Sequence, residues 1–272
     1  GLGCPTWPTC TPESLVATPE MGIHGVIEFG NRTLTGLVGI LALAVVILVW
    51  RMRRTRRDLF VLALVVLAGV VAQALVGGVT VLTGLNPFIV GFHYVVSLVM
   101  VCVCAAFLVR LNEPAGRRVR VVPAWYARVT HLTTVVLALT IAFGVLTTGA
   151  GPHSGDAAAG RNGFDAEILE HVHAWPGYAL LALTLALTGV AWARNLRPRT
   201  WITILLAAEV VQIAVGLYQA RNGLPELAVG IHMVLAALTA AAMTVVILRL
   251  KAPASDAASS LVLAGTARTE TS

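Results

Sequence analysis

The chain of 272 residues is 57% hydrophobic and only 12% charged, with a mean hydropathy of +0.84. Because soluble domains carry about 25% charged residues, this composition excludes a soluble globular protein and indicates an integral membrane protein. The net charge of +6 would suit a nucleic-acid-binding protein, but the basic residues gather in loops between apolar segments, which excludes nucleic acid as a partner.

Seven apolar segments are long enough to cross a membrane as helices of about 20 residues. They cover residues 30–50, 59–82, 88–110, 127–147, 168–192, 201–219 and 225–248. The sequence therefore predicts an all-α fold, a polytopic membrane helical bundle. Residues 1–26 and 149–167 are polar and rich in Gly and Pro, which predicts two long loops. The Ala- and Ser-rich residues 252–272 predict a disordered tail.

Basic residues favour one side of this bundle. They cluster after the first, third, fifth and seventh predicted segments, whereas the other loops keep only Arg32, Arg161 and Arg221. Because positively charged loops stay in the cytoplasm, we predict a multi-pass plasma-membrane protein with residue 1 outside the cytoplasm and the C-terminus inside. Membrane lipid with anionic headgroups is the expected contact of the basic loops.

Two halves of the chain repeat one pattern of polar residues. In each half a glutamine begins a Gln-x-x-x-Gly motif and precedes a histidine by 20 residues, and a glutamate upstream precedes Asn or His by three residues. The repeated positions are Glu28, Asn31, Gln73 and His93 in the first half and Glu170, His173, Gln212 and His232 in the second. Such spacing indicates duplicated units.

From this pattern we predict an N-terminal repeat over residues 1–111, a C-terminal repeat over 112–251 and the tail over 252–272. The second repeat contains four predicted helices and the first contains three. We therefore expect two parallel four-helix units, with the first helix of the first unit missing from this chain because it would precede Gly1.

Three of the repeated positions are histidines at similar depth, roughly 8–9 Å into the membrane. They are His93, His173 and His232. Polar side chains are costly in hydrocarbon and are functional candidates there. The segments that carry His173 and His232 run in the same direction, so these imidazoles can meet at one level as axial ligands of a heme iron. For any single histidine the alternative is a hydrogen bond between helices.

Two further pairs carry chemistry. The repeated glutamates stand one turn before Asn31 and His173, where a carboxylate suits proton transfer or simply favours a helix N-terminus.

Cys4 and Cys10 lie on the predicted outer side, where disulfides persist. Five intervening residues with two prolines can close a loop, so we favour a Cys4–Cys10 disulfide. Free thiols, or a metal or heme attachment site, are the alternatives.

In combination these motifs resemble heme A synthase over residues 1 to about 248. The segments that carry the resemblance are Gly1-Leu-Gly-Cys-Pro-Thr-Trp-Pro-Thr-Cys10, Ile27-Glu-Phe-Gly-Asn-Arg32, Gln73 before His93 and Gln212 before His232. Members of that family have eight helices in two halves. They are oxidoreductases that convert a ring methyl of heme O to a formyl group, which gives heme A for cytochrome oxidase.

The resemblance implies roles for individual residues. It implies that His173 and His232 hold a heme b cofactor through its iron and that His93 belongs to the substrate heme. Glu28 falls on the family's glutamate, which makes it the candidate catalytic residue. The family's outer cysteine pair falls on Cys4 and Cys10.

One departure from the family concerns Asn31, which stands where the commoner motif has histidine. Asparagine is a poor ligand for iron. Either His24 replaces it, or heme O binds through His93 alone and leaves an open iron position beside Asn31 and Glu28. We prefer the second interpretation, because oxidation at iron uses an open position. Arg32 or Arg221 is a candidate partner for heme propionates, with interface anchoring as the alternative.

The partners that the resemblance implies are heme O, heme O synthase, cytochrome oxidase assembly proteins and lipid, and a homo-oligomer stays open. The competing interpretation is a non-catalytic bis-histidine membrane cytochrome that passes electrons from quinol. A transporter with repeated halves ranks last, because the sequence shows no sign of broken helices.

Overall fold

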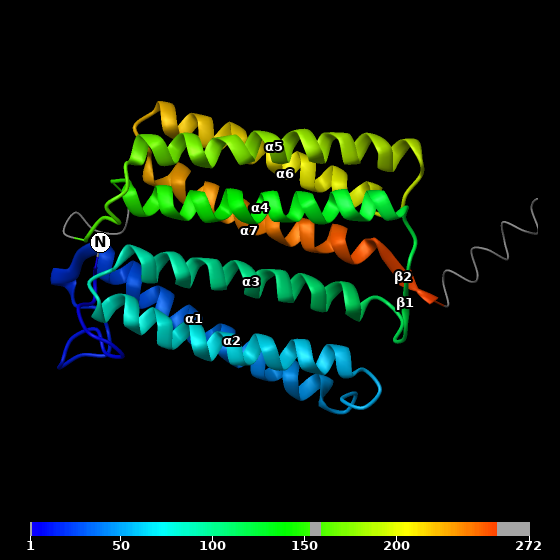
Figure 1. Cartoon of the computed structure of the whole chain (residues 1–272). Helices are drawn as coiled ribbons and strands as arrows, with labels where there is room; N and C mark the ends of the chain where they lie inside the picture. Colours follow the sequence, from blue (N-terminus) through cyan, green and yellow to red (C-terminus); the bar gives the residue numbers. More distant parts are fainter. Residues whose placement is uncertain (1, 153–158, 255–272) are drawn as a thin grey trace, which may run out of the picture. The chain divides into compact units, whose positions relative to one another are not determined.

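The computed structural model describes residues 2–152 and 159–254 (Figure 1). Within these ranges seven helices are long and apolar enough to cross a membrane. They are α1 (Gly22–Trp50), α2 (Arg57–Leu82), α3 (Pro87–Leu111), α4 (Ala124–Ala150), α5 (Ala166–Ala193), α6 (Arg199–Arg221) and α7 (Glu226–Arg249). The predicted all-α membrane fold is confirmed. A helix pairs its backbone polar groups within its own segment, as a hydrocarbon environment requires.

Helix α1 begins well before the start at residue 30 that hydropathy predicted. A short 3₁₀ turn, η1 (Pro19–Met21), leads directly into Gly22. The polar residues Glu28 and Arg32 lowered the hydropathy of this stretch, yet they form an ion pair one turn apart, which supports a helix. The predicted outer loop over 1–26 is therefore wrong at its C-terminal end.

Contacts between Cα atoms group the described residues into two compact units, one within 1–104 and 138–176 and the other within 105–137 and 177–272. In the first unit α1 packs against α2, and in the second α6 packs against α7 (Figure 1). The repeat boundaries at 111/112 and 251/252 stay a prediction.

A small antiparallel ribbon accompanies the helices in the second unit. Strand β1 (Arg118–Arg120) pairs with β2 (Lys251–Pro253), with Val119 opposite Ala252. Ala252 and Pro253, which were predicted to belong to the tail, therefore lie in a strand, because β1 provides backbone partners for them. Residues 255–272, the rest of the predicted tail, lie outside the described residues.

Two helix-to-helix turns are built alike, 139 residues apart. Each contains a glycine and then a leucine with positive φ, Gly84 (60°) and Leu85 (59°) between α2 and α3, and Gly223 (71°) and Leu224 (56°) between α6 and α7. In each turn the leucine N–H donates to the carbonyl oxygen five residues earlier, at 2.8 Å and 2.9 Å. This bond closes the preceding helix. The shared geometry agrees with the repeat that the polar residues indicated.

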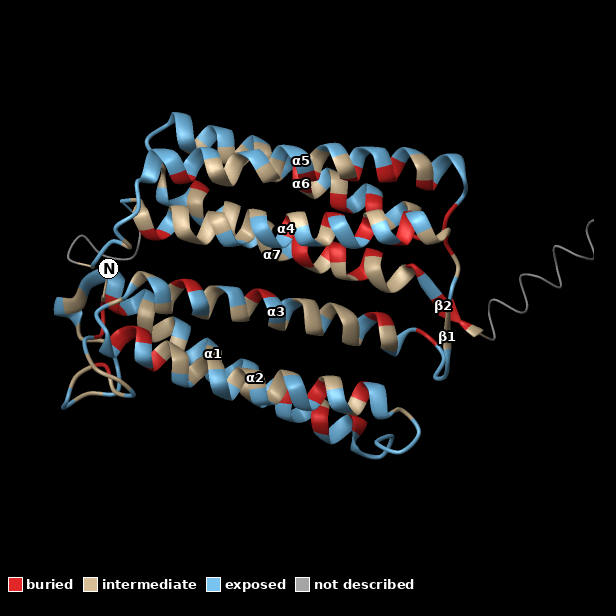
Figure 2. Cartoon of the chain, viewed as in Figure 1, coloured by how far each residue is buried: buried red, intermediate tan, exposed pale blue. Residues whose placement is uncertain are grey.

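Much of the helical surface is exposed (Figure 2), and many of the exposed side chains are apolar. Large side chains stand out on every long helix, for example Leu48 (75% exposed) on α1, Leu185 (60%) on α5 and Val234 (61%) on α7. Water-soluble proteins rarely expose apolar patches of such extent. The surface therefore fits a lipid environment.

Candidate functional site

His93 lies on α3 and packs against α2. A Cβ added to Gly77 of α2 would lie 3.5 Å from Cε1 of the imidazole, so the ring rests on that glycine. The carbonyl oxygen of His93 accepts a hydrogen bond from Gln73 Nε2 at 2.8 Å. Among the described residues Nδ1 of His93 is buried without a hydrogen-bond partner. Helix α2 thus supports both the backbone and the ring of this histidine.

His232 of α7 has the same surroundings on α6. A Cβ added to Gly216 would lie 3.0 Å from Cε1 of its ring, and Gln212 Nε2 donates to the His232 carbonyl oxygen at 3.0 Å. Both repeated glutamines therefore act as hydrogen-bonding supports, one in each hairpin. Each glutamine anchors the histidine backbone, and the glycine that follows it by four residues makes room for the ring.

His173 of α5 packs on α4 in a related manner. A Cβ on Gly144 would lie 2.8 Å from Cε1 of the ring, and Nδ1 of His173 is 2.8 Å from the carbonyl oxygen of Thr140. A hydrogen bond from Nδ1 to a carbonyl fixes the tautomer and the ring orientation, as at a metal-ligating histidine. A second histidine of α5, His171, is exposed and forms a hydrogen bond with the carbonyl oxygen of Glu167 in its own helix. The local structure therefore favours His173.

These surroundings suit imidazoles that ligate heme iron. Each ring lies against a glycine of the preceding helix, which leaves space for the imidazole, and the buried Nδ1 of His93 is an orphaned polar atom. Within the described residues no three side chains of His, Cys, Asp or Glu gather as a metal-ion site. A heme iron needs only two axial ligands, so the residues present fit that group.

Glu28 and Arg32 are both engaged with the outer loop. Glu28 Oε2 accepts the backbone N–H groups of Gly3 and Cys4, each at 2.9 Å, and Oε1 accepts from Arg32 at 2.5 Å. The terminal nitrogens of Arg32 also donate to four loop carbonyl oxygens, those of Cys4, Thr6, Pro8 and Thr9. These contacts occupy both terminal nitrogens of Arg32, which argues against the predicted pairing of Arg32 with a heme propionate.

The outer loop is closed by the predicted disulfide. Cys4 and Cys10 are bonded, fully buried, and 4.5 Å apart between their Cα atoms. A side chain at Gly3 would overlap the backbone of His24 and Gly25, so the loop lies directly on α1. In the middle of the disulfide loop, Trp7 covers Gly78 of α2, the residue after the glycine that supports His93.

The remaining candidates lie on α1 and are exposed. Asn31 follows Glu28 by three residues, as the sequence indicated, and His24 precedes Asn31 by seven. Seven residues of helix correspond to about 10 Å along the axis. His24 is therefore poorly placed to substitute for a ligand at the level of Asn31.

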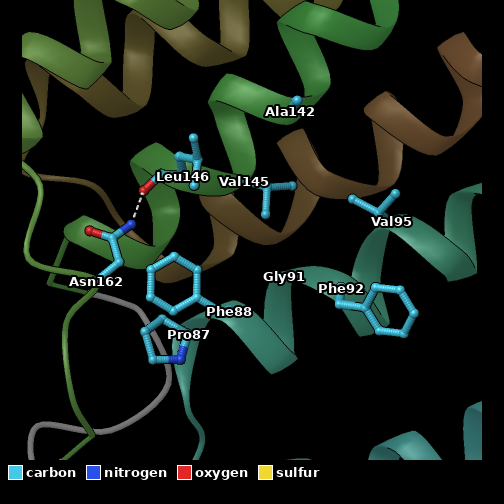
Figure 3. A pocket seen from close by; sticks show the side chains of 9 residues that line it. All are labelled: Pro87, Phe88, Gly91, Phe92, Val95, Ala142, Val145, Leu146 and Asn162. Atoms are coloured by element: carbon cyan, nitrogen blue, oxygen red, sulfur yellow. Dashed lines mark hydrogen bonds between the residues drawn. The ribbon is translucent and has the colours of Figure 1, made fainter.

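An apolar groove lies between α3 and α4, with a volume of about 290 Å³ (Figure 3). Phe88, Phe92 and Val95 line it from α3, and Val145 and Leu146 line it from α4. Successive helix residues are about 100° apart, which places His93 on nearly the opposite face of α3. The groove is therefore separate from the histidine site.

Sequence reasoning missed two buried polar clusters in the second unit. Glu113 is 5% exposed and binds three arginines, Arg118, Arg197 (2.8 Å) and Arg249 (3.9 Å). Glu209 on α6 is 3% exposed and accepts a hydrogen bond from Thr184 of α5 at 2.9 Å. The arginines were interpreted only as topological signals, and Glu209 had no partner that spacing could identify.

Fold and site together define a polytopic membrane protein with histidines held against glycines of neighbouring helices and a disulfide-closed loop at one end. The family COX15-CtaA, described as cytochrome oxidase assembly protein, matches residues 1–154, more than half of the chain. The chain belongs to this family, which confirms the resemblance inferred from the motifs.

Individual relatives are named heme A synthase. The protein of that name from Lysinibacillus sphaericus (strain C3-41) is 36% identical over 104 residues, which is 36% of this chain and 32% of the relative. Those from Listeria welshimeri (31% identical, 39% and 33% covered) and Bacillus mycoides (32% identical, 36% and 32% covered) are similar. The matches thus span about a third of each relative's length. No solved structure matches the chain.

Proposed function

We propose that this protein is a heme A synthase, an oxidoreductase that converts a ring methyl of heme O to the formyl group of heme A. The arrangement that carries the proposal is the repeated one, in which a glutamine anchors the backbone of His93 or His232 and a glycine accommodates the ring. Membership of the cytochrome oxidase assembly family and relatives named heme A synthase support it.

Each half has its own heme in this proposal. His93 anchors the iron of the substrate heme O, with Asn31 and Glu28 toward the open position. His173 and His232 would hold the iron of a heme b cofactor, which would supply electron transfer through the membrane interior. The support is the local packing of each histidine, including the Nδ1 contact of His173 with Thr140.

Glu28 has two proposed contributions. A carboxylate beside the substrate can take or orient a proton during oxidation of the methyl group. Its hydrogen bonds to Gly3, Cys4 and Arg32 support a second contribution, which is to hold the outer loop on α1. A Glu28→Gln variant separates them, because loss of proton handling lowers turnover at unchanged heme O affinity, whereas loss of the loop lowers affinity.

We further propose a plasma-membrane location, with residue 1 outside and the C-terminus in the cytoplasm. The arginine-rich loops support this orientation, and seven span-length helices support a multi-pass protein. Heme O synthase and cytochrome oxidase assembly proteins are the expected partners, because one supplies the substrate and the others use the product.

Heme extraction with mass analysis tests the proposal. The full chain is expressed in a host that makes heme O and purified in detergent, beside His93→Ala and His232→Ala variants. We expect heme b together with heme O or heme A in the parent protein. His93→Ala should lose the heme O-derived species and keep heme b, and His232→Ala should lose heme b.

Heme b alone, unchanged when heme O is supplied, would contradict the synthase and favour the electron carrier. Absence of every heme would contradict both.

A further inference from the structure

Trp7 occupies a position that the histidine chemistry does not explain. It stands in the middle of the loop closed by Cys4 and Cys10, and its indole is half-buried rather than exposed to solvent. A Cβ added to Gly78 of α2 would lie 2.5 Å from Cδ2 and 2.6 Å from Cε2 of the indole, at the fusion of its two rings. The indole therefore lies flat on the helix backbone at this glycine.

The neighbouring glycine supports the candidate substrate ligand. Gly77 lies under the imidazole of His93, so two successive residues of α2 carry one ring each. Successive Cα atoms are 3.8 Å apart, and a heme macrocycle is several times wider than that spacing. The two side-chain directions differ by about 100° around α2, so the imidazole and the indole lie on adjoining faces of the helix, and a heme bound through His93 is wide enough to reach the indole of Trp7.

The contacts of the loop explain how Trp7 keeps this position. The disulfide closes the loop on both sides of the indole. Glu28 holds its N-terminal end through two backbone N–H groups, and Arg32 holds the carbonyl oxygens of Thr6 and Pro8, which flank Trp7 in the sequence. A large aromatic side chain fixed in this way is a contact surface, because aromatic rings stack well on flat ligands.

We propose that Trp7 forms a wall of the substrate-heme site beside His93. Glu28, Arg32 and the Cys4–Cys10 disulfide are positioning residues that hold this wall. The inference rests on the proposed function, because it takes heme O as the ligand of His93. It adds a consequence, namely that heme O binding depends on the oxidised state of the outer loop.

The test measures heme O affinity by titration of the purified full chain, followed by the heme absorbance band. Two variants disturb the wall from opposite sides: Trp7→Ala removes the indole, and Gly78→Ala pushes it off α2. The matched controls are Trp50→Ala, at the other end of α1, and Gly36→Ala, where an added Cβ meets no atom within 4 Å. Heme b content reports whether each variant is folded.

We expect Trp7→Ala and Gly78→Ala to bind heme O about tenfold more weakly with heme b retained, and the controls to behave like the parent protein. Reduction of the disulfide in the parent should weaken heme O binding similarly and should add little in Trp7→Ala.

Affinity within about twofold of the parent in folded Trp7→Ala would overturn the proposal. If that variant fails to fold, the reduction experiment decides, because it needs no substitution, and an unchanged affinity there overturns the proposal equally. A parent protein that binds no heme O at all contradicts the proposed function instead, so the two failures are distinguishable.

Discussion

Glu113 offers a direct test of how the loops of the second unit are held. Its carboxylate binds Arg118 through Oε2 and Arg197 through Oε1, with Arg249 3.9 Å away. These residues come from the α3–α4 connection, the α5–α6 connection and the end of α7. One buried acid therefore joins three segments that are distant in the sequence.

The stability that a Glu113→Gln variant should lose follows from the solvent exposure of the charged side chains. Removal of one partner from a buried ion pair costs about 3–5 kcal/mol. Here the carboxylate is 5% exposed, but the three arginines are 12%, 24% and 31% exposed, so solvent compensates part of the loss. Glu113→Gln also keeps the side-chain volume and one acceptor oxygen. We therefore expect a loss of about 2 kcal/mol in the free energy of unfolding, a factor of about 30 in the folding equilibrium.

The assay is reversible unfolding in mixed detergent and SDS micelles, followed by tryptophan fluorescence. Glu226→Gln is the control, because Glu226 is exposed at the start of α7. In the double variant Glu113→Gln, Arg118→Leu the two losses should not add, since one of the uncompensated charges is gone. The reasoning fails if Glu113→Gln loses no more stability than Glu226→Gln.

Three further predictions concern the membrane helices. Gly144→Ala should displace the His173 ring, because the added Cβ would lie 2.8 Å from Cε1, and should lower heme b content. Gly77→Ala is milder, because its Cβ would lie 3.5 Å from Cε1 of His93, and should cost less heme O binding. Equal losses in the two variants would contradict the packing argument. Gln212→Leu should lose about 1 kcal/mol of stability, since it removes the hydrogen bond to the His232 carbonyl oxygen. Gln73→Leu should lose more, since it removes hydrogen bonds to both the His93 carbonyl oxygen and Ser97 Oγ; unfolding that matches the parent would refute this role. Thr184→Val removes the hydrogen bond that Thr184 donates to the buried Glu209 carboxyl and should cost about 1–3 kcal/mol, whereas Thr184→Ser should retain it.

The helices and the histidines could be predicted because hydropathy and spacing encode them directly. Seven apolar segments became seven helices, and the 20-residue separation of Gln73 from His93 became one hydrogen bond between neighbouring helices. Gln212 and His232 repeat it. The glycine of the repeated motif carried the signal for ring packing, since only a residue without a side chain leaves room for the imidazole.

Other features depend on contacts between distant segments, which spacing does not reveal. Gly144 belongs to no repeated motif, and its importance follows only from the packing of His173, 29 residues later, against it. Glu28 suggested proton chemistry from its place in the pattern, whereas its hydrogen bonds to Gly3 and Cys4 depend on the fold of the outer loop. The start of α1 was missed because hydropathy measures transfer to lipid, and a helix can continue beyond the lipid when its polar side chains pair.

The β1–β2 ribbon constrains how the chain is inserted during synthesis. Its two strands flank α4, α5, α6 and α7, so they can pair only if these four helices together return the chain to the side of the membrane where they began. A single helix left uninserted would leave the strands on opposite sides. Because β2 follows the last helix, the ribbon closes after all four have entered the bilayer, and its formation reports that their insertion is complete.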